Sequence, residues 1–279
     1  MIIMDFNGIA FGSIMANGQN DEPIIRHMVF NTIRMYKTKF QKEYGDVIIA
    51  CDGANNWRRG VYPPYKAHRR KNREKSDFNW DEAFRILNDI RVDIRENFPY
   101  KLIHIEGCEA DDIIGTIIEY TQEFGNYDQV MIISADKDFV RLHTNDNVRQ
   151  FSPLTKKYVA EQNPHLYARI HVFRGDGGDG VPNVLSSDNT FIDGLRQTPL
   201  SKKKMEMLID DPKCLGEEIY RNIQRNDRLI NLKNTPEHLK KEIINSFETQ
   251  DPWPNRGKVF PYMASKKMGR LLESIEEFL

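Results

Sequence analysis

The chain has 279 residues, of which 39% are hydrophobic, and a formal net charge of −1. This length and composition suit one large domain, or a main domain with a smaller one, around a buried core. No apolar run approaches the roughly 18 residues that cross a membrane, and no basic region precedes the short apolar N-terminal stretch, so we expect a cytoplasmic protein that does not contact membranes.

Short apolar strands alternate with helical patterns over the first 160 residues. In chain order, strands are expected at 1–6, 47–52, 101–107 and 130–136, and helices at 23–40, 80–94 and after Glu109. This alternation predicts an α/β domain whose mostly parallel sheet is flanked by helices. Strand signals fade beyond about residue 173, where helices are expected at 203–209, 216–230, 236–247 and 264–278. We therefore expect one domain over 1–172 and a smaller helical domain over 173–279.

Acidic residues stand where these strands end. Parallel sheets collect their ligands at the carboxyl ends of the strands. Further acids follow in "EGCEADD", "SADKDF" and "FRGDGGDGVPN", which gives eight candidate carboxylates without His or Cys: Asp5, Asp52, Glu109, Asp111, Asp136, Asp138, Asp176 and Asp179. Oxygen-only ligands suit Mg²⁺ or Mn²⁺. Two such ions about 3.5 to 4 Å apart can promote in-line attack on phosphorus.

Each acid also has a simpler explanation. A single Asp at a strand end is more often a turn or cap residue, and "GDGGDG" alone is usually a flexible loop. The metal-site hypothesis therefore depends on the joint placement of the acids. Spacing does not choose between Asp111 and Asp112, because positions 109 and 112 share a helix face better than 109 and 111.

A strongly basic segment runs from Trp57 to Lys75 and contains one acid, Glu74. Its eight cations are Arg58, Arg59, Lys66, Arg69, Arg70, Lys71, Arg73 and Lys75. Cations neutralise phosphates, and interleaved aromatic rings can stack on unpaired bases. Such a run is usually a solvated surface loop, but this one follows Asp52 closely, so a phosphodiester bound at the acids would lie within its reach.

The ordered motifs "MDFNG", "CDGANNWRRG", "YPPYK", "RRKNRE", "EGCEADD", "ISADKDF" and "RGDGGDGVPN" resemble the 5′-nuclease (flap endonuclease) superfamily, most closely the ribonucleases H of T-even bacteriophages. The resemblance covers nearly the whole chain. It implies a PIN-like nuclease domain with a mobile basic arch over about 54–80 and a helical domain that holds duplex DNA. It also implies a structure-specific 5′-to-3′ exonuclease and flap endonuclease with ribonuclease H activity, which removes RNA primers and adjacent DNA from lagging-strand fragments.

The same resemblance assigns roles to individual residues. The eight carboxylates match ligands of two Mg²⁺ ions, for which Mn²⁺ can substitute, and Asp112 becomes a cap or support behind them. Arg58 and Lys66 match residues that contact the scissile phosphate. Further nucleic-acid contacts are expected from Arg59, Tyr65, Arg69, Arg70, Lys71, Arg73, Gly175, Gly177, Gly178 and Gly180. The glycines open a helical hairpin that binds K⁺ in many members, although this sequence continues differently, as "NVLSSDNTFIDG".

The expected substrates are 5′-flap or nicked duplex DNA and RNA–DNA hybrid. The resemblance also implies a monomer that works beside a single-stranded-DNA-binding protein and a sliding clamp, in the host bacterial cytoplasm. Two other functions compete with this one. A non-catalytic nucleic-acid-binding protein would be the better interpretation if some of the ligand acids were replaced, but all eight are present. A phosphatase that forms an aspartyl phosphate would need DxD at the first strand end, where this chain reads "DFN".

Overall fold

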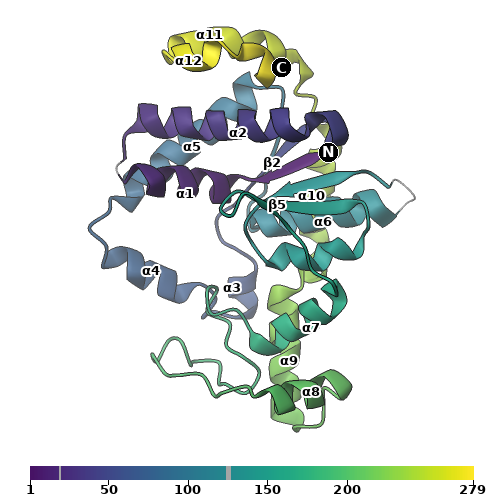
Figure 1. Ribbon diagram of the computed structural model, residues 1–279. Coiled ribbons are helices and arrows are strands. Elements are labelled where there is room, and N and C mark those ends of the chain that lie inside the picture. The colour runs from purple at the N-terminus through teal and green to yellow at the C-terminus, as the bar shows by residue number, and fades with distance from the viewer. Residues whose placement is uncertain (19, 124–126) are drawn as a thin grey trace.

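The computed structural model describes residues 1–18, 20–123 and 127–279, which fold around a six-stranded sheet (Figure 1). The strands lie in the order β3-β2-β1-β4-β5-β6. Their bounds are β1 (Ile2–Asp5), β2 (Val47–Cys51), β3 (Lys101–His104), β4 (Val130–Ile133), β5 (Val148–Ser152) and β6 (Lys157–Val159). β1 to β5 pair in parallel and β6 pairs antiparallel to β5. The expected mostly parallel α/β sheet is confirmed.

Helices cover both faces of this sheet. Their bounds are α1 (Phe6–Asn17), α2 (Glu22–Tyr44), α3 (Arg58–Val61), α4 (Ala67–Glu74), α5 (Trp80–Asn97), α6 (Ala110–Glu123), α7 (Pro164–Arg174), α8 (Lys202–Asp210), α9 (Glu217–Ile230), α10 (Glu237–Thr249), α11 (Val259–Ser265) and α12 (Gly269–Leu272). Short 3₁₀ helices are η1 (Asp138–Thr144), η2 (Leu232–Asn234), η3 (Trp253–Lys258) and η4 (Ile275–Phe278). None of the helices in this described part of the chain is both long and apolar enough to span a membrane.

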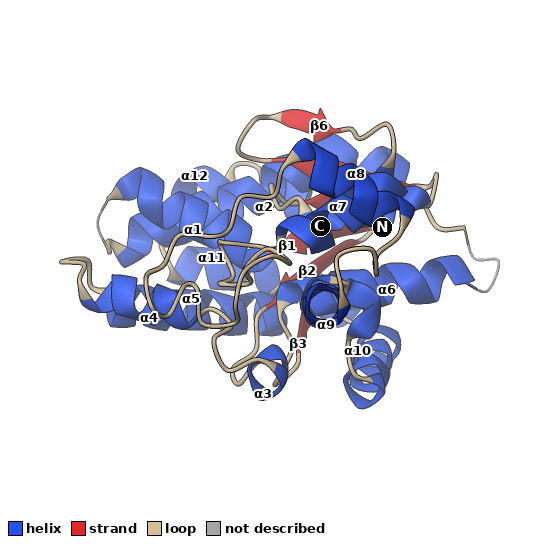
Figure 2. Ribbon diagram, turned by 90° about the horizontal axis from the view of Figure 1, so that it is seen from below, coloured by secondary structure: helices blue, strands red, loops and turns tan. Residues whose placement is uncertain are grey.

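The alternation of side chains along β1 shows how the two faces are filled. Ile2 and Met4 pack with α1, α2 and α5, whereas Ile3 packs with α6 and α10. Figure 2 shows the strands between these two groups of helices. Strands buried on both faces need continuous apolar runs, and β1 and β4 have them. β1 pairs with both β2 and β4, so residues that follow these three strands are neighbours in space.

The C-terminal helices pack in two different places. α7, α8 and α9 form a separate apolar cluster around Phe173, Leu208 and Ile223. From η2 onward the chain returns to the sheet, where Leu239 packs with α6 and Tyr262 with α2 and α5. Figure 1 places α11 and α12 at the opposite end of the molecule from α8. This packing differs from a single helical unit over 173–279, because the apolar faces of the last helices cover the sheet.

Some elements differ from the sequence expectation. The helix expected over 264–278 is broken into short pieces near Lys267, whose φ of 56° lies in the left-handed region. α1 was not expected as a helix, because its residues are apolar on most sides and show no clear period. β5, with the sequence VRQFS, is too polar and short to be recognised as a strand. The helical hairpin expected to open at the glycines is also absent from 175–201, which form turns and irregular backbone.

Candidate active site

Acids from three neighbouring strands meet at the carboxyl edge of the sheet. Asp5 ends β1, Asp52 follows β2, and Asp136 follows β4. Asp5 accepts hydrogen bonds from the Gly8 N–H at 3.0 Å and the Ser134 hydroxyl at 3.1 Å. Burial, with a smaller contribution from the Asp52 charge, raises the pKa of Asp5 to about 6. A cation at this edge would reverse that shift.

Asp52 joins this edge to the start of α6. Its carboxylate accepts the Ala110 N–H at 2.7 Å and the Asn7 side-chain amide at 2.5 Å. Burial raises the pKa of Asp52, and the nearby Glu109 charge adds to the effect. Asp52, after β2, and Glu109, before α6, are therefore close enough for their charges to interact.

Asp111, Asp136 and Asp138 form a close group of acids. One carboxylate oxygen from each lies within 4.8 Å of the other two. The Asp138 N–H also donates to Asp136 at 2.9 Å, which orients the turn between β4 and η1. Burial, and then the Asp136 charge, raises the pKa values of both Asp111 and Asp138 well above the ordinary value. Oxygen ligands crowded in this way fit a divalent cation, which would balance their repulsion.

His171 is a member of the site that the sequence reasoning missed. It lies in the last turn of α7, with Nδ1 3.4 Å from Asp138 Oδ1 and Nε2 4.0 Å from Asp176 Oδ2. One ligand atom from each of these three residues also lies within 4.8 Å of the others. Burial lowers the pKa of His171 despite the neighbouring acids. Its position five residues before Asp176 was the available signal.

The loop after α7 carries Asp176 and Asp179. Asp179 donates its N–H to the Asp176 side chain at 3.1 Å, and burial raises the pKa of Asp176. Gly175 has φ of 66°, and a Cβ there would lie 2.4 Å from the Val181 carbonyl oxygen. Only glycine fits this close approach, which turns the loop back toward the arch. Gly177, Gly178 and Gly180 lie in the turns that follow.

The basic arch touches both ends of the acid cluster. Lys66 Nζ lies 2.5 Å from Glu109 Oε1 and 3.4 Å from Asp179 Oδ2, and the Lys66 N–H donates to the Asp179 carbonyl. The Tyr65 hydroxyl lies 2.7 Å from a carboxylate oxygen of each of the same two acids. Burial opposes the Lys66 charge, but Glu109 and Asp179 outweigh it and raise the Lys66 pKa. The arch is thus fastened across the site by groups that also suit a phosphate.

Arg58 and Asp112 form a buried ion pair behind Glu109. Asp112 is 0% exposed, and two nitrogens of the Arg58 guanidinium donate to its two oxygens, each at 2.8 Å. Arg58 also donates to the Leu229 carbonyl at 2.7 Å and lies 3.4 Å from Glu109. Asp112 accepts the Glu109 N–H at 2.9 Å, as in a capping box. In this arrangement Arg58 faces protein groups, and its contact with a scissile phosphate stays a prediction.

Glu109 lies close to two cations, Lys66 and Arg58. Burial opposes its ionisation, but the charges of Lys66 and Arg58 outweigh burial and hold its pKa below the ordinary value. The pKa of Glu109 is therefore shifted in the opposite direction from the raised pKa values of Asp5, Asp111 and Asp138. The Tyr65 ring beside it is buried among Val181, Leu229 and Ile230, so it is not presented to bases in this arrangement.

Several expected nucleic-acid contacts line an open cavity beside the acids. The cavity has a volume of about 820 Å³ between the arch and α5. Arg59, Arg69 and Arg73 lie along it, and Asp52 and Glu109 lie at its margin. Arg69 also reaches Asp179 at 2.5 Å. The side chains of Arg70 and Lys71 lie outside the described residues, although their backbone belongs to α4.

A second group of acids shares a smaller hollow under the arch. Asp111, Asp138, Asp176 and Asp179 line it together with Arg58 and Tyr65. Since Asp179 meets Glu109 through Tyr65, the eight expected carboxylates form one continuous cluster. The structure therefore brings together acids from β1, β2, the start of α6, η1 and the glycine loop.

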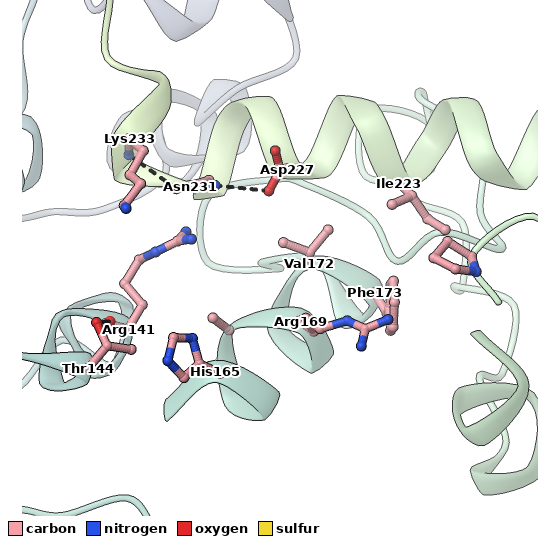
Figure 3. Close-up of a pocket in the computed structure, with 12 residues that line it drawn as sticks. Arg141, Thr144, His165, Arg169, Val172, Phe173, Ile223, Asp227, Asn231 and Lys233 are labelled. Carbon is pink, nitrogen blue, oxygen red and sulfur yellow. Dashed lines mark hydrogen bonds between the residues drawn. The ribbon is translucent and has the colours of Figure 1, made fainter. Parts of the chain in front are cut away.

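Another cavity, of about 450 Å³, is lined by residues of η1, α7 and α9 (Figure 3). Its lining includes the basic side chains of Arg141, Arg169 and Lys233, together with His165 and Val172. It contains one acid, Asp227, which accepts from the Asn231 side chain at 3.1 Å. This cavity lacks the paired carboxylates of the cluster, so we place the candidate active site at the carboxyl edge of the sheet.

Comparison with known proteins gives similar chains over almost the whole length. The ribonuclease H of Enterobacteria phage T4 is 28% identical, over 99% of this chain and 95% of the relative. A 5′-3′ exonuclease of Buchnera aphidicola is 27% identical, over 82% of this chain and 75% of the relative. A solved structure of the bacteriophage T5 5′-exonuclease with bound zinc has a TM-score of 0.62 at 18% identity, over 94% of this chain and 98% of that chain. That likeness is one of fold.

Two family descriptions together match the chain from end to end. The first, "5'-3' exonuclease, N-terminal resolvase-like domain", matches residues 1–170, and the second, "T4 RNase H, C terminal", matches residues 163–278. The resemblance inferred from the motifs is thereby confirmed. Since the first description alone matches more than half of the chain, the protein belongs to the 5′-3′ exonuclease family of nucleases.

Proposed function

We propose that this 5′-nuclease hydrolyses phosphodiesters with two Mg²⁺ ions and acts on 5′ flaps, nicked duplex DNA and RNA–DNA hybrid. In this role it would remove RNA primers with the adjacent DNA from lagging-strand fragments. One observation carries the proposal: eight carboxylates converge under an arch whose cations reach the same acids. Such an arrangement matches a substrate that brings phosphate to bound metal.

The proposed metal ligands are the eight carboxylates of the cluster. Asp111, Asp136 and Asp138 would share one position, and Asp176 and Asp179 would complete a second beside Asp138. Asp5, Asp52 and Glu109 would hold the ions from the sheet side. Divalent ions supply an acidified water and neutralise the leaving oxygen when bound. Because the ligand set is dominated by oxygen, Mg²⁺ is proposed as the working ion, and Mn²⁺ should substitute.

The protein groups around the cluster would position the substrate. Lys66 can exchange its contact with Glu109 for one with a phosphate oxygen, since the Glu109 carboxylate and the phosphate are both anions. The Tyr65 hydroxyl, with a single proton, can donate to one of its two acids and orient it. Arg59, Arg69 and Arg73 would contact further phosphates along the cavity. Arg58 would act mainly by fixing Glu109 and Asp112.

Duplex binding is proposed for the glycine loop and the helical region that follows. A solved complex of the T5 flap endonuclease is described as containing DNA and metal ions. By analogy, the backbone of Gly175, Gly177, Gly178 and Gly180 would approach one strand, and K⁺ is proposed there. A single-stranded-DNA-binding protein and a sliding clamp are proposed partners of the monomer. The non-catalytic alternative is not favoured, because the acid cluster is complete.

The test is cleavage of a labelled 5′-flap duplex and of an RNA–DNA hybrid, with Mg²⁺, with Mn²⁺ and with EDTA. We expect short 5′ products with either metal and none with EDTA. The same assay is run on Asp138→Asn, which changes one proposed metal ligand. Asp146→Asn is its matched control, because Asp146 is an exposed acid just beyond η1. Cleavage that persists in EDTA, or no cleavage of either substrate with any divalent ion, would refute the proposed function.

A further inference from the structure

His171 is placed among the acids of the cluster by helix packing. Its ring is 17% exposed and sits between Asp138, which begins η1, and Asp176, which follows α7. α7 packs directly against η1. The Tyr167 ring, one helical turn earlier, lies 6.0 Å from the imidazole in an edge-on arrangement. The ring is therefore held at the acids on two sides and supported on a third.

The spacing of these three side chains suits a shared ion. Ligand atoms bound at about 2.1 Å around one octahedral ion lie about 3 Å apart when adjacent and about 4.2 Å apart when opposite. One ligand atom from each of the three side chains lies within 4.8 Å of the other two. Nδ1 is 3.4 Å from Asp138 Oδ1, between those two limits, whereas the 4.0 Å contact with Asp176 Oδ2 is made by the other ring nitrogen, Nε2. A small rotation of the ring would direct one nitrogen at an ion between the carboxylates.

We propose that His171 supplies a nitrogen ligand to a divalent ion shared with Asp138 and Asp176, and that this ligand favours Mn²⁺ over Mg²⁺. The inference rests on the proposed function, because it concerns an ion at the same centre. Imidazole binds Mn²⁺ and later transition ions more readily than Mg²⁺, which prefers oxygen. An otherwise all-oxygen centre would thus acquire a selectivity that carboxylates alone do not give.

A simpler explanation makes the opposite prediction. His171 could serve only as a counter-charge that relieves repulsion among the acids until a metal displaces it. In that case, removal of the imidazole would leave both ions bound as tightly as before, or more tightly. If His171 is a ligand, in contrast, its removal should weaken Mn²⁺ binding and change Mg²⁺ binding much less. Asp136, Asp179 and Arg141 also act electrostatically on this ring, and all three stay unchanged when only the imidazole is removed.

The experiment compares His171→Ala with His165→Ala in the metal-free full-length protein. His165 is an exposed histidine on the same helix that lines the other cavity (Figure 3), so it controls for the loss of an imidazole. Mn²⁺ and Mg²⁺ affinities are measured by calorimetry, and pulsed electron paramagnetic resonance of bound Mn²⁺ detects a coordinated ¹⁴N.

We expect a ¹⁴N signal in the wild type and in His165→Ala that disappears in His171→Ala. Mn²⁺ affinity in His171→Ala should fall about tenfold or more, while Mg²⁺ affinity changes much less. His171→Gln, which fills more of the space, repeats the test if the alanine variant unfolds. Absence of the ¹⁴N signal in a wild type that cleaves with Mg²⁺ would overturn this inference alone. Unchanged or tighter Mn²⁺ binding in both His171 variants would do the same.

Discussion

Removal of the Arg58 charge tests whether this residue supports the site or touches the substrate. In Arg58→Met, Asp112 would keep its hydrogen bonds from the Glu109 N–H, the Thr235 hydroxyl and the Trp57 indole. It would lose two 2.8 Å bonds to the guanidinium and its only cation within salt-bridge distance among the described residues. A fully buried carboxylate would then remain without a counter-charge.

Breaking one partner of such a pair costs about 3 to 5 kcal/mol. A chain of 279 residues has an unfolding entropy of roughly 0.6 kcal/mol per kelvin, so the midpoint of thermal unfolding should fall by roughly 5 to 9 °C. The double variant with Asp112→Asn removes both charges and keeps an acceptor. It should be more stable than the sum of the two single effects predicts, by about 2 kcal/mol.

Thermal and urea unfolding in EDTA measure these differences, and single-turnover cleavage is followed in parallel. Arg59→Met is the matched control, because Arg59 is the exposed neighbour that lines the large cavity. Its stability should change by less than about 0.5 kcal/mol. If Arg58→Met is as stable as Arg59→Met but cleaves a hundredfold more slowly, Arg58 acts on the phosphate and the structural reasoning fails.

Three further predictions concern the acids and the arch. Asp138→Asn should abolish cleavage, retain duplex binding and raise stability in EDTA, because it removes one charge from crowded carboxylates; loss of binding with unfolding would contradict this. Lys66→Met should slow single-turnover cleavage roughly a hundredfold, about 2.7 kcal/mol, with little change in flap affinity. The reason is that the Lys66 charge stabilises the transition state selectively. Cleavage at the wild-type rate would show that the arch is only a surface loop. For Asp5, whose folded pKa of about 6 exceeds the ordinary 3.8, the folded state retains a proton that the unfolded state releases. Unfolding free energy in EDTA should therefore fall as pH rises from about 4 to 6, and a pH series of urea midpoints should show a shallower slope in Asp5→Asn.

The strands that carry the acids were accessible from sequence because their signals are local. β1 and β4 are short apolar runs that end at or just before an acid, and parallel pairing brings such ends together. The order of the strands and the pairing of β6 depend on contacts between distant segments, which periodicity does not report. β5 and the apolar helix α1 were missed because their residues lack a distinctive pattern.

Within the site, residue types were easier to predict than partners. Asp111 and Asp112 have the same side chain, and spacing alone did not separate them; the buried guanidinium of Arg58 holds Asp112 away from the acid cluster, as the resemblance implied. The resemblance assigns Arg58 a contact with the scissile phosphate, which stays a prediction; in this structure its guanidinium pairs with the buried Asp112. His171 was missed because its partner Asp138 lies 33 positions earlier in the sequence and belongs to another element. These contacts are set by the packing of α7 on η1.

The way α11 to η4 complete the first hydrophobic core has a consequence for biosynthesis. Phe30 and Phe98 stack with ring centroids 4.5 Å apart, and Tyr262 and Phe278 close over them from the last part of the chain. While the protein emerges from the ribosome, this aromatic surface stays uncovered until those residues are made. Nascent chains with exposed apolar surface are prone to aggregate, so this face is vulnerable until α11 to η4 have been made. The active-site acids can thus assemble earlier than the layer that protects the opposite end of the domain.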